Sequence, residues 1–263
     1  MAGKDRQRVL AREKLERQMA RRAAAARRRR QVQAGLGAAL AVVVVVAGVA
    51  FLVTQLGGDE SKTTPAAAGN SATPGGCAYP KSAQPASKDV GVPTVADVPD
   101  AGTQTVTMKT NVGTITVALD LTNAPCTAHS FAHLAAQRYF DGTSCHRLLD
   151  KDQTYVLQCG DPTGSGTGGP GYDFANENLP TGADNPYPAG TVAMANSGPD
   201  TNGSQFFIVY RDSTFRPDYS VFGTVTSGLD VVATAAAKGV RPGTDQPKEK
   251  VTFSSVTVAA PKP

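Results

Sequence analysis

The stretch of the chain with the clearest chemical character is Met194 to Tyr210, MANSGPDTNGSQFFIVY. Its second half alternates in the manner of a strand, so Gln205 and Phe207 are expected on one face. Asn196, which precedes a turn-rich segment, is expected near the same surface. Two amide groups beside an aromatic ring can hold an extended peptide and an apolar group, but they supply no nucleophile. The stretch therefore indicates peptide binding rather than hydrolysis.

Other patterns of potentially reactive residues give weaker signals. Residues 164–169, GSGTGG, satisfy GxGxxG, but no helical pattern follows them, so dinucleotide binding is not supported. His129 and His133 are four residues apart on a predicted helix, without an evident third metal ligand. His146 is expected to be a packing residue. A nucleophile elbow is also missing, so we expect no hydrolytic triad. Taken with the patterns above, we also expect no metal and no cofactor.

Three blocks of the sequence resemble the cyclophilin family of peptidyl-prolyl isomerases. The first comprises Cys145-His146-Arg147-Leu148 and Gln158-Cys159-Gly160-Asp161, the second is the MAN-GP-TNGSQFF run, and the third is Val221-Phe222-Gly223. In this order they span more than half of the chain, roughly residues 103–258. The resemblance implies a mainly β fold, a closed eight-stranded antiparallel barrel capped by two helices. It also implies rotation about the peptide bond before proline.

The resemblance also assigns roles to individual residues. Arg147 is the expected catalytic arginine, Gln158 supports the bound carbonyl, and Asn196 anchors the peptide main chain with the backbone of Ala195. A guanidinium suits this reaction because it donates hydrogen bonds without changing its protonation state. The residues expected to contact the proline and its neighbours are Tyr155, Val156, Gln205, Phe207, Phe215 and Tyr219.

The sequence departs from the family pattern in the substrate pocket. Arg147 and Gln158 are separated by three more residues than is commonest in the family. Thr214 stands where many members have tryptophan, Phe215 where they have leucine, and Tyr219 where they have histidine. These departures leave the substrate preference and the sensitivity to cyclosporin open.

The charge pattern divides the chain. Residues 1–30 contain twelve Lys or Arg and three acids, and Ala34 to Leu56 form a run of 23 residues without charge. Such a run is long enough to cross a bilayer as a helix, and the positive-inside rule places residues 1–33 in the cytoplasm. A cleaved secretory signal is the alternative. The basic segment is expected to set topology and attract lipid headgroups rather than bind nucleic acid.

The predicted domains follow from these patterns. Residues 1–33 form a basic cytoplasmic segment, 34–56 a transmembrane helix, 57–100 a disordered linker rich in Ala, Pro, Ser and Thr, and 101–260 a monomeric isomerase domain outside the cytoplasm. Cys77 and Tyr79 interrupt the linker, which hints that part of it contacts the domain.

Four cysteines follow the predicted span, in a compartment where disulfides persist, and they allow three pairings. Cys145 and Cys159 lie on strands expected to be neighbours, so their pairing is preferred. Cys77 would then bond to Cys126. The other two pairings stay open.

The local patterns predict a hairpin around Asn111-Val112-Gly113 and a helix from Pro125 to about Tyr139, with Thr122 and Asn123 as candidate caps. A second helix is predicted over residues 229–238. The remaining predicted strands cover residues 144–149, 154–159, 191–195, 205–210, 220–225 and 251–258.

Two functions fit this sequence. The favoured one is a membrane-anchored isomerase that acts on proline-containing polypeptides outside the cytoplasm and assists their folding. The alternative is a catalytically weak module of the cell envelope that binds proline-containing peptides. Retention of Arg147 favours the enzyme, since a pure binder has less need of it.

Overall fold

The computed structural model describes residues 76–181 and 187–262. The basic segment and the span predicted at residues 34–56 lie outside these ranges. Within them, no helix combines the length and the apolar character needed to cross a membrane.

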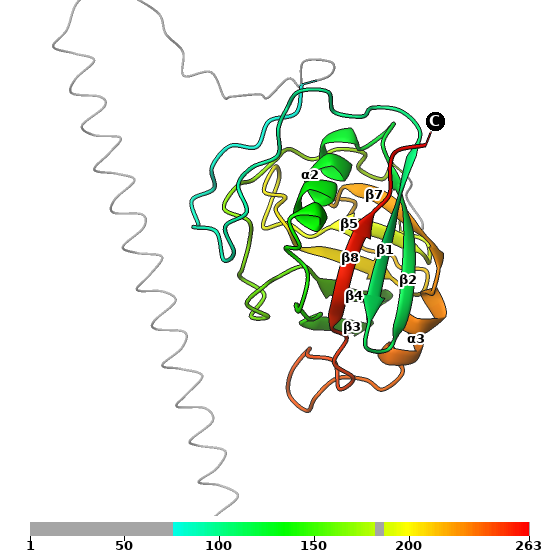
Figure 1. Ribbon diagram of the computed structural model, residues 1–263. Helices are drawn as coiled ribbons and strands as arrows, with labels where there is room; N and C mark the ends of the chain where they lie inside the picture. The colour runs from blue at the N-terminus through cyan, green and yellow to red at the C-terminus, as the bar shows by residue number, and fades with distance from the viewer. Residues whose placement is uncertain (1–75, 182–186, 263) are drawn as a thin grey trace, which may run out of the picture. The chain divides into compact units, whose positions relative to one another are not determined.

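The described residues form a mainly β domain with two helices (Figure 1). The elements in chain order are β1 (Thr103–Thr110), β2 (Gly113–Asp120), α2 (Pro125–Ala136), β3 (Arg147–Lys151), β4 (Thr154–Cys159), β5 (Thr191–Met194), β6 (Phe206–Val209), β7 (Val221–Ser227), α3 (Leu229–Ala236) and β8 (Phe253–Val258). The predicted hairpin, both helices and every predicted strand are confirmed, with bounds that differ by a few residues.

The strands form one antiparallel sheet in the order β3-β4-β6-β5-β7-β2-β1-β8. The prediction of eight antiparallel strands is therefore confirmed. The ladder itself is a half-barrel rather than the closed barrel that the resemblance implies, because β3 and β8 are the ends of the order and do not pair with each other. The chain segments before these two strands meet at an isolated bridge between Ser144 and Thr252, and Cys145 N donates to the Val251 carbonyl over 2.9 Å.

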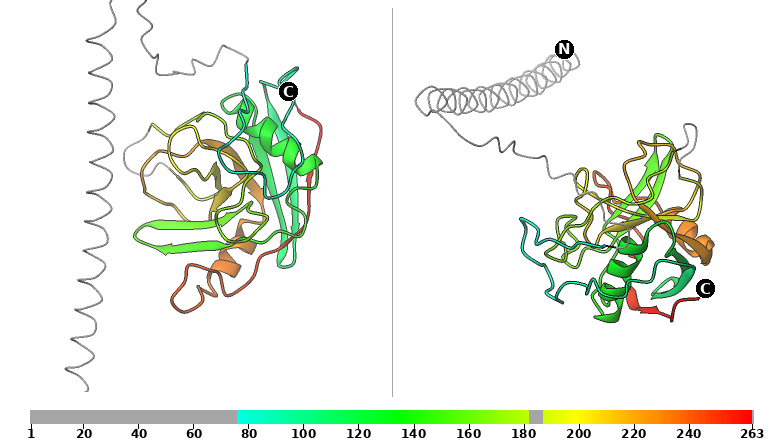
Figure 2. Two further views of the ribbon diagram at one scale, coloured as in Figure 1. Left: turned by 90° about the vertical axis from the view of Figure 1, so that its left-hand side faces the viewer. Right: turned by 90° about the horizontal axis from the view of Figure 1, so that it is seen from above.

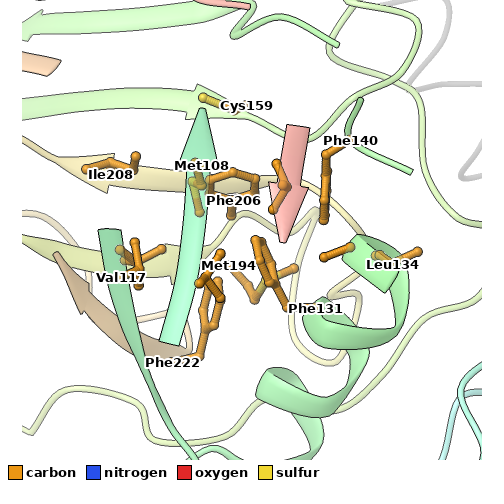
Figure 3. Close-up of a cluster of buried hydrophobic side chains, with 14 of the residues drawn as sticks. Met108, Val117, Phe131, Leu134, Phe140, Cys159, Met194, Phe206, Ile208 and Phe222 are labelled. Atoms are coloured by element: carbon orange, nitrogen blue, oxygen red, sulfur yellow. The ribbon is translucent and has the colours of Figure 1, made fainter. Parts of the chain in front are cut away.

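The core lies between the inner face of the sheet and α2 (Figure 3). Phe131 on α2 stacks on Phe140, with ring centroids 4.9 Å apart, and meets the edge of Phe206 at 5.3 Å. Met108 and Phe222 complete this part of the core from β1 and β7. Since α2 packs against β8 and β7, the helix covers the inner face of the sheet.

Strand β6 is buried on both faces. Phe206 and Ile208 enter the core, whereas Phe207 and Val209 enter a second apolar cluster on the outer face. We call this second group the outer cluster. It consists of Val156, Tyr187, Ala193, Phe207 and Val209, with Leu149, Ala195, Phe215, Tyr219 and Val221 packed against it.

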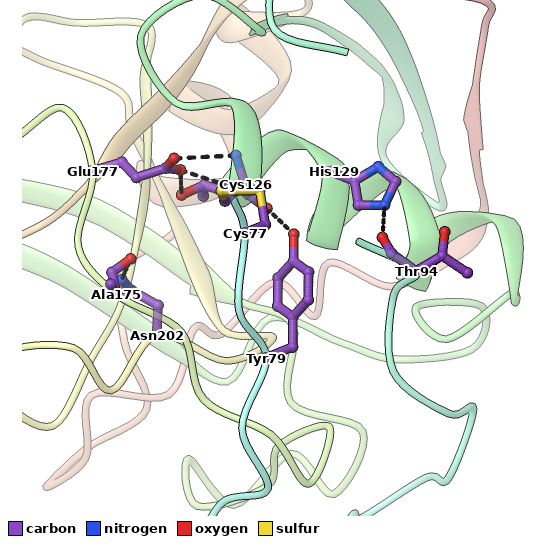
Figure 4. Close-up of a disulfide and its surroundings, with 9 residues drawn as sticks. Cys77, Tyr79, Thr94, Cys126, His129, Ala175, Glu177 and Asn202 are labelled. Atoms are coloured by element: carbon purple, nitrogen blue, oxygen red, sulfur yellow. Dashed lines mark hydrogen bonds between the residues drawn. A yellow bond between two sulfur atoms is a disulfide. The ribbon is translucent and has the colours of Figure 1, made fainter. Parts of the chain in front are cut away.

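The amino terminus of α2 is capped by a residue distant in sequence. Its N-cap residue is Ala124, which offers no side-chain cap, so the expectation that Thr122 or Asn123 caps the helix is wrong. The Glu177 carboxylate instead accepts hydrogen bonds from Cys126 N at 3.1 Å and Thr127 N at 2.7 Å (Figure 4).

Residues 76–100, which we call the extension, contain no long regular element but are bound to the domain (Figures 1 and 2). Disulfides join Cys77 to Cys126 and Cys145 to Cys159, which confirms the preferred pairing. Tyr79 is buried and donates to the Cys126 carbonyl over 2.7 Å (Figure 4). The extension therefore differs from the free linker expected for this stretch, because the disulfide and the buried tyrosine fasten it to α2.

Candidate functional site

A single row of residues crosses four strands on the outer face of the sheet. The register pairs Arg147 of β3 with Gln158 of β4, Gln158 with Phe207 of β6, and Phe207 with Ala193 of β5. Residues directly opposed in antiparallel strands share a face. The backbones of β3 and β6 are two strand spacings of about 4.8 Å apart, so Arg147 and Phe207 can contact one bound residue between them.

The outer cluster forms the apolar part of the site. Phe207 presents its face or edge to Phe215 at 5.8 Å and to Tyr219 at 5.4 Å. Tyr187 stacks on Phe215 at 4.2 Å, and its hydroxyl accepts a hydrogen bond from Tyr219 N at 3.1 Å. Tyr187 thus fixes Phe215 and Tyr219, the two aromatic residues in the part of the pocket that departs from the family pattern.

Arg147 is held at the edge of this cluster by a loop near the carboxyl terminus. Its Nε lies 3.5 Å from Asp245 Oδ2, and Lys151 Nζ lies 3.5 Å from the other oxygen of the same carboxylate. Asp245 is itself fixed to β3, since its carbonyl accepts a hydrogen bond from Leu148 N at 2.7 Å. The Arg147 side chain remains 47% exposed. A ligand can therefore reach a guanidinium whose orientation is constrained.

Two glutamine amides connect the row to the glycine-rich loop of residues 164–171, which we call the glycine loop. Gln158 Nε2 donates to Gln205 Oε1 over 2.8 Å. Gln205 Nε2 in turn donates to the carbonyls of Gly166 and Gly168, each over 3.0 Å. The two amides are consequently oriented before any substrate arrives.

Asn196 and Ala195 lie at the other side of the site, after β5. Asn196 Nδ2 donates to the Asp218 carbonyl over 2.9 Å, and Ala195 N donates to the Gln205 carbonyl over 2.9 Å. Asn196 therefore joins the two loops that flank the outer cluster.

Tyr155 is the one expected contact residue that the structure does not bring to this site. The alternation along β4 places it on the opposite face from Val156. Its ring lies edge-on to Tyr210 at 6.2 Å, and the Arg211 guanidinium lies 3.5 Å from its centroid. The other nine expected residues are gathered in the row, the outer cluster and the adjoining groove: Arg147, Val156, Gln158, Ala195, Asn196, Gln205, Phe207, Phe215 and Tyr219.

A groove of about 430 Å³ adjoins the row, and we call it the amide groove. Gln158 and Gln205 line it on the side of the row, and Ala195 and Asn196 lie beside them. The glycine loop and residues 82–85 of the extension also line it, and the remaining lining residues are Tyr172, Asp173, Ser197, Thr201, Gly203 and Ser204.

Asp161 anchors the glycine loop from beneath. Its buried carboxylate accepts hydrogen bonds from Thr163 N at 2.7 Å, Thr163 Oγ1 at 2.8 Å and Gly166 N at 2.6 Å. Burial alone would raise the pKa of Asp161, but these hydrogen bonds stabilise the anion and hold the pKa below its ordinary value.

His146 is a half-buried neighbour of Arg147 rather than a base in the row. Burial lowers the pKa of His146, and the positive charge of Arg147 lowers it further, while Asp161 and Gln205 oppose the shift. The imidazole is therefore neutral near pH 7 and adds no charge to the site. Among the described residues, no group of three or more His, Cys, Asp or Glu could hold a metal ion.

Three contributors to the site were missed by the sequence analysis. Asp245 and Tyr187 belong to loops without a recognisable pattern. Asp161 belongs to one of the motifs, but no role was predicted for it. The available signal was an acid three residues before the glycine-rich run of residues 164–169.

The comparisons with known proteins agree with this geometry. Residues 105–258 match the family model described as "Cyclophilin type peptidyl-prolyl cis-trans isomerase/CLD". The chain is 48% identical over 194 residues to the "Probable peptidyl-prolyl cis-trans isomerase B" of Mycobacterium tuberculosis, a match that covers 68% of this chain and 63% of that protein. It is 40% identical over 171 residues to the "Peptidyl-prolyl cis-trans isomerase B" of Streptomyces anulatus, covering 58% of this chain and 94% of the relative.

Among solved structures, a cyclophilin type peptidyl-prolyl cis-trans isomerase of Cryptosporidium parvum superposes with a TM-score of 0.54 at 27% identity. The match covers 61% of this chain and 99% of that one. The same Cryptosporidium protein in the presence of the dipeptide Ala-Pro gives a TM-score of 0.53, also at 27% identity, covering 59% of this chain and 99% of that one.

The match to the mycobacterial relative covers a larger share of this chain than residues 105–263 can supply, so it reaches into the residues before Thr105. The family model and the ordered row of Arg147, Gln158 and Phe207 lead to one conclusion. The chain belongs to the family of cyclophilin type peptidyl-prolyl cis-trans isomerases.

Proposed function

We propose that this protein catalyses rotation about X-Pro peptide bonds in polypeptide substrates. The observation that carries the proposal is the row in which Arg147 and Gln158 lie beside Phe207 and the outer cluster. The Cryptosporidium relative studied in the presence of Ala-Pro supports the same class of ligand.

The chemistry requires no bond to break. Rotation meets a barrier of about 18–20 kcal/mol because the planar amide loses its resonance. As the amide twists, the prolyl nitrogen becomes pyramidal and gains a lone pair that a guanidinium N–H of Arg147 can satisfy. This interaction is stronger in the twisted state than in the planar one, so it lowers the barrier rather than merely tightening binding.

The remaining residues hold the two sides of the bond. The outer cluster can bury the proline ring, and each buried methylene contributes about 0.8 kcal/mol. Gln158 and Gln205 are fixed to each other and to the glycine loop, so they can hold the backbone before the proline without a large loss of side-chain entropy.

Exchange between the cis and trans forms of an Ala-Pro peptide, followed by NMR with catalytic amounts of the full chain in detergent, tests this function. We expect Arg147→Ala to lower the catalysed exchange rate on the order of 100-fold, as for loss of a preorganised donor. Lys109→Ala removes one cation from the exposed face of β1 and serves as the matched control. Equal exchange rates for the wild type and Arg147→Ala would contradict the proposal that the protein is an isomerase.

The binding-module alternative gives a different result in the same experiment. Tyr187 and Phe215 form a stacked wall in the altered part of the pocket, which is the observation that favours it. A weak catalyst would shift the peptide resonances on binding and leave the exchange rate at its spontaneous value.

We further propose that a single span at residues 34–56 anchors the protein, with residues 1–33 in the cytoplasm and a monomeric catalytic domain outside. There the domain would assist the folding of exported chains. The charge pattern supports this topology, and so do two disulfides, which persist in oxidising compartments. Protease digestion of intact spheroplasts should remove the domain and spare the basic segment; protection of the domain would contradict the proposal.

A further inference from the structure

The extension, which precedes the family domain, lines the amide groove. Residues 82–85 contribute four of its lining residues and line it together with Gln158 and Gln205. They are held there by backbone pairing with the glycine loop: Ser82 N donates to the Gly171 carbonyl over 3.0 Å and Ser87 N donates to the Gly169 carbonyl over 2.9 Å.

The glycine loop is shaped to receive the extension. A Cβ on Gly171 would lie 2.9 Å from both Cβ and N of Ala86, and its φ of +85° already favours glycine. A Cβ on Gly168 would lie 2.9 Å from Ser87 Oγ, besides meeting Asp161. The absence of side chains at these two positions lets the extension approach the loop closely.

Both ends of the groove-lining segment are fastened. On one side are the Cys77–Cys126 disulfide and the buried Tyr79. On the other side, Lys88 Nζ donates to the carbonyls of Arg138 and Tyr139. A turn in which Ser82 Oγ accepts from Gln84 N at 3.1 Å sets the shape of the segment between them.

The described lining of the groove mixes polar and apolar groups and carries a single acid. Asp173 is the only Asp, Glu, Lys or Arg among the described lining residues. None of the ion pairs formed within the described part of the chain includes it. Its backbone N donates to the Pro80 carbonyl over 3.0 Å, so the extension also fixes the position of this acid. A groove of this kind favours a basic side chain.

We propose that residues 82–85 of the extension and Asp173 give the amide groove a preference for a basic residue on the amino-terminal side of the isomerised X-Pro bond, and we call this part of the groove the subsite. The subsite rests on the proposed function. The groove is assigned to the amino-terminal side of the X-Pro bond because of Gln205. This residue lines the groove, lies two residues before Phe207 of the outer cluster and is expected to face the residue before proline.

The test compares peptides that carry Lys or Gln at each of the first three positions before an Ala-Pro bond. For the full chain, kcat/KM should be about two- to fivefold higher with Lys than with Gln at one of these three positions. This ratio corresponds to the free energy of a partly exposed ion pair. Asp173→Asn and Gln84→Lys should each lower this Lys/Gln ratio to one or below. Gln84 is exposed, so the added charge is not expected to disturb folding.

Val92→Lys is the matched control, because it adds the same charge to the extension at a residue that is 56% exposed and does not line the groove. It should leave the Lys/Gln ratio unchanged. A ratio of one for the wild type, or the same ratio for Gln84→Lys and Val92→Lys, would overturn the subsite.

A capped Ala-Pro dipeptide, which is too short to enter the groove, separates the two proposals. If it is isomerised while the ratio is insensitive to Gln84→Lys, the subsite fails and the enzyme stands. If neither the dipeptide nor the longer peptides are isomerised, the proposed function fails and the subsite fails with it.

Discussion

At Asp161 the protein stabilises a buried carboxylate that forms no ion pair with any Lys or Arg of the described residues. Its charge is balanced by N–H and O–H donors from Thr163 and the glycine loop, which are strong because the acceptor is ionised. The loop that carries the Gln205 contacts depends on this anion. We therefore regard Asp161 as a positioning residue for the amide groove.

This arrangement predicts a specific pH dependence. The pKa of Asp161 is lowered in the folded state, so its contribution is fully present above the ordinary carboxyl pKa of about 4 and is lost as the pH falls through the lowered value. Asp161→Asn should lower the free energy of unfolding by about 1–3 kcal/mol at pH 7, because the asparagine amide turns a donor toward Gly166 N.

Urea unfolding of both proteins between pH 7 and pH 2 measures this effect. The difference between wild type and Asp161→Asn should shrink below about pH 4. A difference that stays constant over the whole range would contradict the role of the anion.

The residues that could be predicted are those whose neighbours in the sequence define them. Arg147, Gln158 and Phe207 stand in motifs on strands with clear patterns, and the strand register then aligns them. Asp245 could not be found this way, because it reaches Arg147 from a loop almost one hundred residues later. Tyr155 was assigned to the pocket by resemblance, although strand alternation places it on the opposite face from Val156.

At the level of elements, α2 shows how a helix can begin without a local cap. Pro125 provides the first-turn signal that the sequence revealed, but no side chain at the N-cap position completes it. Glu177 does so from about fifty residues away and brings a negative charge to the positive end of the helix dipole. The contact leaves no signal in the sequence of the helix itself.

Removing that cap should be measurable. We expect Glu177→Ala to lower the free energy of unfolding by about 1–2 kcal/mol, the usual cost of losing an N-cap. Glu177→Gln, which keeps an acceptor, should cost less. Glu249→Ala is the control, since no hydrogen bond or ion pair involving its side chain is seen in the described chain, and it should change stability by less than about 0.5 kcal/mol. Equal effects of Glu177→Ala and Glu249→Ala in urea unfolding would refute the capping role.

Strand β6 marks another limit of local patterns. Its four residues, FFIV, are all buried, because the outer cluster covers the face that usually meets solvent. The strand itself was predictable from its β-branched and aromatic residues. Burial of its second face depends on Tyr187, from the loop before β5, and on Phe215 and Tyr219, from the loop between β6 and β7.

For the molecule as a whole, the sequence motifs identify the family domain, whereas composition misjudges part of the tract before it. The tract before Thr103 has few large apolar residues, a composition that predicts a flexible tether. In the structure, Cys77 and Tyr79 supply the covalent and apolar contacts that the tract otherwise lacks. A few well-placed residues were enough to attach a segment whose average composition predicts disorder.

The two disulfides should therefore differ in their effects. Chain-entropy estimates give about 4 kcal/mol for the 49-residue separation of Cys77 and Cys126, and about 3 kcal/mol for the 14-residue separation of Cys145 and Cys159. Replacing Cys77 and Cys126 together with Ser should also abolish the Lys/Gln preference. Replacing the other pair should spare that preference.

Thermal unfolding and the peptide assay, each on both double variants, check these expectations. An unchanged Lys/Gln ratio after loss of the Cys77–Cys126 bond would show that the extension stays in place without it, and that its backbone pairing alone is sufficient.

The Cys77–Cys126 bond also decides where mechanical load would enter the domain. Residues 78–125 form a covalently closed loop, so tension applied to the chain upstream of Cys77 passes through sulfur directly to the start of α2. The β1–β2 hairpin lies inside that loop and is bypassed. While the bond is intact, pulling on the amino-terminal side cannot peel this hairpin from the sheet, and residues 82–85, which lie inside the same loop, carry none of the load.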